Sequence, residues 1–396
     1  MKLRKGLALV LALGMLTAMV GCDNADNFES SSSGPAIPEG PIILEADEVK
    51  NVILFIGDGM GPEQVKFGEI MKESKLSFQE FPYFVEMDTN SIDGDGRFVT
   101  TDSAAAATAL ATGTLTTNGR VGMAPTSDDE LETIMDIAKN MGKRTGVITT
   151  ENLNGATPMG FSGHADSRNS TKTLLDSAAR SGIDFFASDV TGNRNYFTDN
   201  GYTVLAYLEQ YETYKQDAKL FCNMQIKAGV EEDNQTYETF HETVATALDF
   251  LSQDSDGFVL MAEGAHIDHG GHNNDIDYMV EELLAFDLGV EAALRWAYGR
   301  TDTVVIVTAD HETGDLHLRD GITKDNYRDM GASADGFSYE TLYYYWGSTS
   351  HSNAEVGFYV NGKNIDFAAY SYFEKDFMIK NTDTFKIMKA LLENKI

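Results

Sequence analysis

The chain has 396 residues, of which 42% are hydrophobic and 23% charged, a composition typical of a soluble globular protein. Its 62 acidic residues outnumber the 30 Lys and Arg residues, which gives a net charge of −32. A surface this acidic repels nucleic acid, which argues against a nucleic acid as a specific partner. The length suffices for one large α/β domain or two smaller ones.

The first 21 residues are predicted to be an export signal. A basic start precedes an apolar run over residues 6–20, which is short for a membrane span and typical of a signal peptide. The run ends at Cys22, in a sequence that resembles the lipobox of bacterial lipoproteins, although Met19 stands where Leu is usual. We expect secretion across the cytoplasmic membrane and a lipid anchor at Cys22, which would hold the protein at the cell surface or in the periplasm. The alternative is a plain secretory signal with an incidental cysteine.

A flexible linker is predicted to follow the signal. Residues 22–41 are rich in Ser, Gly, Pro and acidic residues, as is typical of a tether. Apart from Cys22 the chain contains only Cys222, so the mature chain is expected to form no intrachain disulfide. The folded domain is expected over residues 42–396, held by its core and further stabilised by bound metals.

Short, continuous apolar runs within this domain predict buried strands of a mainly parallel sheet. Helical patterns lie between them at residues 127–144, 279–297 and 384–392. Strands that alternate with helices predict a single large α/β domain, with helices on both faces of the central sheet. The runs are Val52–Ile56, Gly146–Thr149, Phe258–Ala262, Thr303–Thr308 and Val356–Val360.

Polar side chains that could bind metal lie beyond the predicted strands. Ligands of an open parallel sheet bind outside the carboxyl ends of its strands. Carboxylates together with imidazoles suit Zn²⁺, and positions with oxygen atoms alone suit Mg²⁺. Each residue by itself could cap a turn or form an ordinary hydrogen-bonded pair, so only the whole group argues for a metal centre. The candidates are Asp58, Thr157, Glu263, His266, Asp268, His269, His272, Asp310, His311 and His351, and Arg168 belongs to the same polar clusters without being a metal ligand.

Ser103 is the candidate nucleophile. It precedes four consecutive alanines, a sequence that favours a helix with Thr101 or Asp102 as its N-cap. The free N–H groups and the dipole at a helix N-terminus attract an anion such as phosphate. A simple capping serine would give the same pattern, so both interpretations stay open on this feature alone.

Five short motifs occur along the chain, at residues 56–61 (IGDGMG), 101–105 (TDSAA), 156–158 (Ala-Thr-Pro), 263–268 (EGAHID) and 308–311 (TADH). In this order they resemble the motif series of the alkaline phosphatases, and the match runs from about Val52 to the last predicted strand. The spacing between Asp268 and His272 fits the same family, and His351 falls where its last zinc-binding histidine is expected.

The resemblance implies two zinc sites, one magnesium site and a phosphate-binding arginine. The ligands of the first Zn²⁺ would be Asp268, His272 and His351. Those of the second, which would also bind Ser103, would be Asp58, Asp310 and His311. Those of the Mg²⁺ would be Asp58, Thr157 and Glu263. Arg168 would bind two phosphate oxygens through its planar guanidinium.

The implied activity is hydrolysis of phosphate monoesters to an alcohol and inorganic phosphate, through a phosphoserine at Ser103. Two metals can stabilise the entering and leaving oxygens of such an in-line displacement. The rival enzymes are a related phosphodiesterase, which would usually use Thr and lack the arginine, and a sulfatase, whose C/S-x-P-x-R motif is not found around Ser103. A surface lipoprotein that only binds metal or phosphate would need neither Ser103 nor Arg168. Dimers are common in the family, so the resemblance leaves a homodimer open.

Two positions depart from the family's pattern. Gly155 stands where members carry Asp or His near the magnesium, and His269 stands where some bacterial members have Lys. The sequence therefore supports the magnesium site least, and Asn154 and Glu151 are the nearest candidates for the missing contact. The aromatic-rich segment at 312–350 is expected to be an insertion near the mouth of the site.

Overall fold

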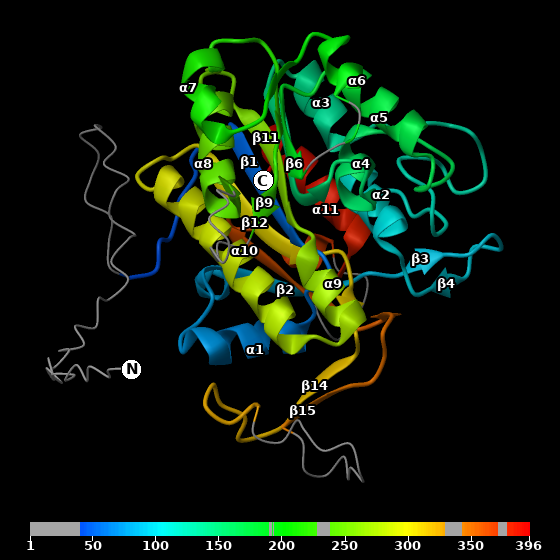
Figure 1. Cartoon of the computed structure of the whole chain (residues 1–396), viewed down its shortest axis with the longest axis vertical. Coiled ribbons are helices and arrows are strands. Elements are labelled where there is room, and N and C mark those ends of the chain that lie inside the picture. Colours follow the sequence, from blue (N-terminus) through cyan, green and yellow to red (C-terminus); the bar gives the residue numbers. More distant parts are fainter. Residues whose placement is uncertain (1–39, 190–191, 193, 228–237, 329–342, 371–377) are drawn as a thin grey trace, which may run out of the picture. The chain divides into compact units, whose positions relative to one another are not determined.

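Within the residues that the structure describes, ten strands form one large, mostly parallel sheet at the centre of the fold (Figure 1). The structure is a computed structural model, and it describes residues 40–189, 192, 194–227, 238–328, 343–370 and 378–396. The predicted signal peptide at 1–21, the lipidation site Cys22 and nearly all of the linker at 22–41 lie outside the described residues. Residues 37–396 form one compact unit.

The central strands are buried on both faces. The strands of the sheet are β1 (Asn51–Gly57), β2 (Tyr83–Asp88), β5 (Arg144–Asn152), β6 (Phe185–Asp189), β7 (Thr203–Leu205), β8 (Leu220–Asn223), β11 (Phe258–Gly264), β12 (Thr303–Ala309), β17 (Val356–Asn361) and β18 (Ile379–Lys380). Their order across the sheet is β18-β2-β17-β12-β1-β11-β5-β6-β8-β7. β1 pairs in parallel with β11 and β12, and every residue of these three strands is buried. Burial on both faces requires apolar residues at nearly every position, which explains the continuous runs in the sequence.

The predicted parallel sheet is confirmed, with one departure at β17. This strand runs antiparallel to both of its neighbours, β12 and β2. Its buried residues alternate with half-buried ones over the first four positions, because this part of the sheet is less completely covered. Strands β2, β6, β7, β8 and β18 were not expected from the sequence, because they are short or lack a long apolar run.

Helices cover both faces of the sheet, as predicted (Figure 1). One face carries α1 (Pro62–Lys72), α8 (Phe240–Leu251) and α10 (Ile276–Ala297). The other carries α2 (Ser103–Thr112), α3 (Ile134–Asn140), α4 (Ala156–Ser162) and α11 (Asn381–Leu392). Helix α2 is buried along its whole length, which its small alanine side chains permit because they allow close packing against α4 and α11.

The start of α3 corrects one sequence-based prediction. The sequence predicted a helix from Ser127 onward, but the helix begins at Ile134. Its cap is Thr133, whose hydroxyl accepts a hydrogen bond from the Asp136 N–H, while the Asp136 carboxylate accepts one from the Thr133 N–H. This reciprocal cap competes successfully with the earlier acidic residues, because it satisfies two N–H groups that the helix leaves free.

Shorter elements connect the large ones. They are α5 (Thr171–Arg180), α6 (Asn195–Thr198), α7 (Tyr211–Tyr214), α9 (His266–Asn273), β3 (Ser91–Ile92), β4 (Phe98–Val99), β9 (Ile226–Lys227), β10 (Glu238–Thr239), β13 (Glu312–Thr313), β14 (Leu316–Leu318), β15 (Tyr344–Trp346) and β16 (His351–Ser352). The segment expected as an insertion spans residues 312–350, of which 329–342 lie outside the described part. Within it, β14 pairs with β15. At its two ends, β13 pairs with β16, which begins one residue after the segment. The pairing of Thr313 with His351 returns the chain to the end of β12.

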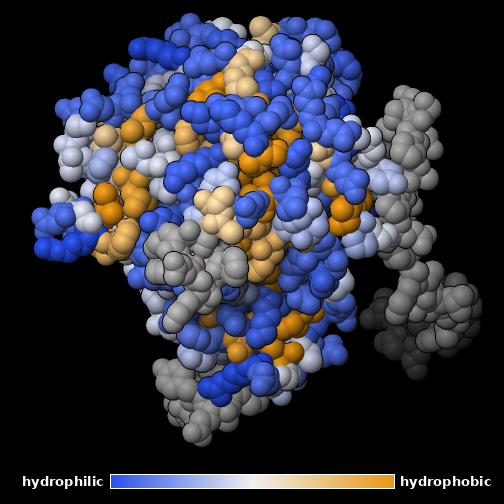
Figure 2. All heavy atoms as spheres, turned by 180° about the vertical axis from the view of Figure 1, so that it is seen from behind, coloured by the Kyte–Doolittle hydropathy of each residue, from blue (hydrophilic) through white to orange (hydrophobic). Residues whose placement is uncertain are grey.

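The surface is mainly polar. Figure 2 shows one face of the molecule, on which hydrophilic residues predominate and hydrophobic ones form small, separate groups. A few large apolar side chains are exposed singly, among them Phe84 and Phe98. No helix in the described residues is both long and apolar enough to cross a lipid bilayer.

Candidate active site

Three carboxylates meet where the central parallel strands end. Asp58 directly follows β1, Asp310 directly follows β12, and Glu263 lies near the end of β11 opposite Ile56. All three are almost fully buried, with exposed fractions of 6%, 0% and 0%. Gly59 lets the chain turn here, since its φ is +72° and an added Cβ would lie 2.7 Å from the Asp268 Cα. The turn after β1 therefore packs directly against α9.

Helix α9 brings Asp268 and His272 onto one face, because residues four apart are neighbours on a helix. The His272 Nε2 lies 3.3 Å from the Asp268 Oδ2 and 3.2 Å from the His351 Nε2. The His351 Nε2 also lies 3.6 Å from the Asp268 Oδ1. The three residues implied as ligands of the first zinc are therefore adjacent, although they come from segments about eighty residues apart.

His311 connects this set with the second one. Its ring stacks on that of His351 with 3.5 Å between ring centroids, and its Nε2 lies 3.5 Å from the Asp58 Oδ1 and 3.2 Å from the Asp310 Oδ2. Two groups of residues could each hold a metal ion, because the ligand atoms within each group lie within 4.8 Å of one another. One group is Asp58, Asp310 and His311, and the other is Asp268, His311 and His351. The first group is the one implied for the second zinc, and in the second group His311 takes the place expected for His272.

The residues around these ligands fix their orientation. The His272 Nδ1 lies 2.7 Å from the Thr349 carbonyl oxygen, and the His351 Nδ1 lies 2.9 Å from the Thr101 carbonyl oxygen. The Thr313 hydroxyl donates a 2.5 Å hydrogen bond to the Asp268 Oδ1. With one ring nitrogen held in this way, the other nitrogen of each histidine is directed toward the site. Thr313 was not predicted from the sequence, where its place two residues after His311 was the available signal.

Ser103 is the first residue of α2, as predicted, and its N-cap is Asp102. The Ser103 Oγ lies 3.2 Å from the His311 Nε2, which places it beside the candidate metal ligands. Ser103 is 5% exposed and lies in the first turn of α2, where a helix leaves N–H groups without partners in the helix. The side chain therefore stands where the helix N-terminus and the metal ligands meet.

Asp102 links the nucleophile to Arg168. Its Oδ1 accepts a hydrogen bond from the Ala105 N–H, and its Oδ2 accepts from the Gly119 N–H and, at 3.2 Å, from the Arg168 Nη1. The Arg168 side chain keeps 38% of its surface exposed, so the guanidinium also faces solvent at the open side of the site. The carboxylate thus caps α2 and orients the arginine at the same time.

The buried oxygen atoms of the site lack hydrogen-bond partners. Among the described residues, the Asp58 Oδ1, the Asp310 Oδ2, the Thr157 Oγ1 and both Glu263 carboxylate oxygens are buried without a hydrogen bond. Buried polar atoms are nearly always paired, and an unpaired one is costly. Because the unpaired atoms are all oxygens and mostly carboxylates, they fit a hard divalent cation.

Burial and mutual repulsion raise the pKa values of these carboxyl groups. Burial is the main cause of the raised pKa of Asp58 and of Glu263, and the negative charges of neighbouring carboxylates add to it. Burial also raises the pKa of Asp310 to about 7, with a further contribution from Asp268. Burial, followed by the nearby charges of His351, His272 and Arg168, holds the pKa of His311 well below its ordinary value. His311 is therefore a neutral ring that can donate its lone pair to a metal.

Glu151 also belongs to this site, although it was not among the predicted ligands. It lies near the end of β5, and its negative charge contributes to the raised pKa of both Asp58 and Glu263. Burial raises the pKa of Glu151 itself, while His266 and Arg168 lower it. The sequence analysis named Glu151 only as a candidate for a contact that Gly155 cannot make.

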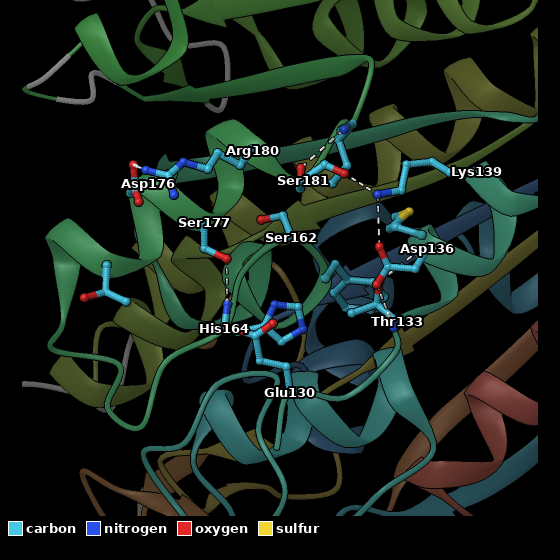
Figure 3. Close-up of a pocket in the computed structure, with 14 residues that line it drawn as sticks. Glu130, Thr133, Asp136, Lys139, Ser162, His164, Asp176, Ser177, Arg180 and Ser181 are labelled. Atoms are coloured by element: carbon cyan, nitrogen blue, oxygen red, sulfur yellow. Dashed lines mark hydrogen bonds and ion pairs between the residues drawn. The ribbon is translucent and has the colours of Figure 1, made fainter. Parts of the chain in front are cut away.

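A hollow away from the strand ends is lined by residues of α3, α4 and α5 (Figure 3). It has a volume of about 430 Å³ and is lined by polar side chains that include His164, Lys139 and Arg180. These side chains are engaged with other groups: Lys139 with Asp136, Arg180 with Asp176, and the His164 Nε2 with the Leu131 carbonyl oxygen. None of the predicted site residues lines this hollow, so the strand ends remain the candidate active site.

The whole chain was compared with known proteins. The family model described as "Alkaline phosphatase" matches residues 49–195 and 196–358, which include every residue of the site described above. The chain belongs to the alkaline phosphatase family. This membership confirms the resemblance stated from the five sequence motifs.

Individual relatives agree with this assignment to the alkaline phosphatase family. Alkaline phosphatase 4 of Bacillus subtilis is 31% identical over 292 residues, covering 67% of this chain and 62% of that protein. Alkaline phosphatase 3 of the same organism is 30% identical over 328 residues, covering 74% of this chain and 69% of that protein. The chain thus spans about two thirds of the length of these two curated relatives.

The fold agrees with solved members of the alkaline phosphatase family. The alkaline phosphatase of the Antarctic bacterium TAB5 superposes with a TM-score of 0.72 at 25% identity, covering 88% of this chain and 99% of that one. A mutant of the TAB5 protein, solved with Mg bound in its M3 site, has the same TM-score at 26% identity. The predicted fold class, a large mainly parallel sheet of the alkaline phosphatase type, is confirmed.

Proposed function

We propose that the protein hydrolyses phosphate monoesters, with Ser103 as the nucleophile that becomes transiently phosphorylated. The observation that carries this proposal is the position of the Ser103 Oγ, 3.2 Å from the His311 Nε2 and at the N-terminus of α2. His311 belongs to both groups of potential metal ligands. A hydroxyl in this place can be activated by a metal and can reach a phosphate bound at the helix N-terminus.

The residues present fit three metal ions. The nitrogen-containing sets would hold two Zn²⁺, one with Asp268, His272 and His351 and one with Asp58, Asp310 and His311. The oxygen-only set of Asp58, Thr157 and Glu263 would hold Mg²⁺. The buried oxygens without partners support this fit, because bound cations would compensate their charge. When bound, a pair of zinc ions would lower the pKa of the serine hydroxyl and stabilise charge on the leaving oxygen.

The other steps of the reaction would be carried out by side chains and N–H groups of the protein. Ser103 attacks phosphorus and displaces the alcohol of the ester, and water then hydrolyses the phosphoserine to release inorganic phosphate and restore the hydroxyl. The N–H groups at the N-terminus of α2 stabilise the negative charge of the phosphoryl group. Arg168 holds two phosphoryl oxygens with its guanidinium, which Asp102 keeps aligned at 3.2 Å. Thr313, His272 and His351 keep their positions through hydrogen bonds, so little rearrangement is needed when substrate enters.

The alternatives fit these side chains less well. A phosphodiesterase would not need an arginine that binds two free phosphoryl oxygens. A diester has two alkylated oxygens where a monoester has one, so it has one free oxygen fewer to offer beside the metals. A sulfatase needs its own modifiable residue motif, which is not found around Ser103. A protein that only bound metal or phosphate would have no use for a serine hydroxyl 3.2 Å from a ligand histidine.

One assay tests the proposal. Purified protein should hydrolyse a chromogenic phosphate monoester, and its diester and sulfate analogues much more slowly. Chelation should abolish the hydrolysis, and Zn²⁺ with Mg²⁺ should restore it and raise the melting temperature, because the ions bind only the folded state. Full activity after complete removal of metal would refute the proposal, and faster cleavage of the diester or the sulfate would favour the corresponding rival.

We further propose that the protein is exported and held at the membrane by a lipid on Cys22. The basis is the order of a basic start, an apolar run, Cys22 and a polar linker in the sequence. Cys22→Ser should release the protein from the membrane fraction and leave its specific activity unchanged. Equal membrane retention of the variant and the wild type would contradict the anchor.

A further inference from the structure

The position at which family members carry an acidic residue or a histidine is occupied here by Gly155, and another side chain fills the space. A Cβ added to Gly155 would lie 1.8 Å from the Glu151 Oε1 and 2.6 Å from its carboxyl carbon. The backbone does not require glycine at this point, because its φ of −55° and ψ of 157° are open to any residue. Glycine at 155 is thus explained by the room that Glu151 needs.

Glu151 reaches this space because of the way β5 ends. The pairing of β5 with β11 runs up to Thr149, which lies opposite Glu263. The pairing of β5 with β6 shifts its register between Ile148 and Asn152. Glu151 lies in this irregular stretch, two residues beyond the last pair with β11. Its carboxylate lies beside Gly155, the N-cap of α4 two residues before Thr157, and its negative charge adds to the burial that raises the pKa of Asp58 and Glu263.

We propose that Glu151 replaces the missing side chain at position 155 and, with Asp58, Glu263 and Thr157, completes an oxygen-only site for a divalent cation. The inference deepens the function proposed above and rests on its third metal site. Three carboxylates and a hydroxyl favour a hard cation such as Mg²⁺ over Zn²⁺, because no nitrogen or sulfur ligand is present.

The protein compensates these carboxylates only in part: His266 and Arg168 lower the pKa of Glu151, and the side chains of Thr149 and Thr157 lower that of Glu263, yet both pKa values stay raised by burial. Both Glu263 oxygens are completely buried without a hydrogen bond. Within the part of the chain that the structure describes, the Glu151 carboxylate forms no hydrogen bond or ion pair. His266 lowers the pKa of Glu151 more than any other charged group does, but its Nδ1 lies 3.7 Å from the Glu282 Oε1. Like charges buried together destabilise the fold unless a cation joins them.

The first test measures Mg²⁺ binding directly. Metal-stripped protein is reloaded with Zn²⁺, and MgCl₂ is titrated into it by isothermal calorimetry. Glu151→Gln should weaken Mg²⁺ binding by about ten- to a hundredfold, the usual effect of removing a group that supports a metal. Glu282→Gln is the matched control, because it also removes a carboxylate beside His266; its Mg²⁺ affinity should equal that of the wild type. An unchanged affinity in Glu151→Gln would overturn the inference.

Thermal unfolding separates lost binding from a damaged fold. Without Mg²⁺, Glu151→Gln should melt at the same temperature as the wild type or higher, because one of the repelling charges is gone. With Mg²⁺, its melting temperature should rise less than that of the wild type. A variant that melts lower without Mg²⁺ and gains as much as the wild type on adding it would show that Glu151 serves the fold, and would refute the proposal.

Exchanging the two positions gives an independent test. Gly155→Asp alone should weaken Mg²⁺ binding, because its Cβ would collide with the Glu151 carboxylate. The double variant Glu151→Ala with Gly155→Asp should bind Mg²⁺ more tightly than either single variant, because one carboxylate then occupies the space. If the losses of Mg²⁺ affinity in the two single variants simply added up in the double variant, a carboxylate at position 155 could not replace Glu151, and the proposal would be contradicted.

The outcomes also separate this inference from the proposed function. If the wild type binds Mg²⁺ through Glu151 but hydrolyses no phosphate monoester, the proposed function fails and the inference stands. If the wild type is an active phosphatase and the Mg²⁺ affinity of Glu151→Gln equals that of the wild type, the inference fails and the proposed function stands.

Discussion

Two adjoining parts of the site are held together in different ways. We call Asp268, His272, His311 and His351 the histidine group, and Asp58, Glu151, Thr157 and Glu263 the carboxylate group. In the histidine group, Nδ1 atoms contact carbonyl oxygens and Thr313 donates to Asp268, so the protein itself positions the ligands. In the carboxylate group, both Glu263 oxygens and the Thr157 hydroxyl are buried without a hydrogen bond.

The difference follows from the chemistry of the side chains. An imidazole has two nitrogens, so one can be held by the protein while the other binds a metal. An ionised carboxylate only accepts hydrogen bonds, and several buried together repel one another. We therefore expect the histidine group to keep its arrangement when metals are removed, and the carboxylate group to depend on a cation for its stability.

The largest expected effect comes from removing the nucleophile beside the histidine group. Ser103→Ala should lower phosphate monoester turnover by roughly a thousandfold or more, because the covalent route is lost. Zinc content, measured by atomic absorption, should stay the same, since without the Ser103 hydroxyl His311 keeps its contacts with Asp58, Asp310 and the ring of His351. Quenching during turnover of a ³²P-labelled substrate should label Ser103 in the wild type. An active alanine variant would end the covalent mechanism.

Arg168 connects the histidine group and the carboxylate group, because its positive charge acts on residues of both. It lowers the pKa of His311 in the histidine group and that of Glu151 near the carboxylate group. Arg168→Ala should lower the ratio of monoester to diester kcat/KM by about ten- to a hundredfold, the equivalent of one charge-assisted hydrogen bond. Arg168→Lys should recover only part of this loss, because an ammonium cannot bind two oxygens in a plane. Equal losses for both substrates would assign the arginine a general electrostatic role.

The smallest expected effect is a pH dependence of stability in the metal-stripped protein. The folded-state pKa values of Asp58 and Glu263 are raised, and that of Asp310 is raised to about 7, so at these three groups the folded state binds more protons than the unfolded state between about pH 4 and pH 7. The lowered pKa of His311 acts in the opposite direction at one group, so the three carboxyl groups decide the sign. The metal-free protein should accordingly lose stability as the pH rises through this range. Cations should remove that loss, because they compensate the carboxylates once these are ionised.

Melting temperatures at several pH values, with and without Zn²⁺ and Mg²⁺, measure this effect. The metal-free curve should fall from pH 4 to pH 7, and the metal-loaded curve should not. If the two curves run parallel, the carboxylate group does not depend on a cation, and the contrast with the histidine group is lost.

The amino-acid sequence by itself predicted the strands at the centre of the sheet and named most of the candidate site residues. Strands such as β1 and β12 are buried on both faces, so their composition is apolar throughout and visible without tertiary information. Asp58, Asp310 and His311 were candidates because of their position after those strands, and the resemblance to the family supplied their expected roles as ligands. The start of α2 at Ser103 was also predicted, because an alanine-rich helix with a capping Asp102 has a local signature, whereas the role of Ser103 as nucleophile came from the resemblance.

Tertiary structure decided the features that depend on distant segments. The position of His351 beside His311 results from the pairing of β13 with β16, which no local pattern encodes. The roles of Asp102 and Thr313 depend on which side chains lie within hydrogen-bond distance after folding. From the sequence, Glu151 and Asn154 were equal candidates for the magnesium-site contact that Gly155 cannot make. The structure selected Glu151, because only the end of β5 shows that its carboxylate fills the space left by Gly155.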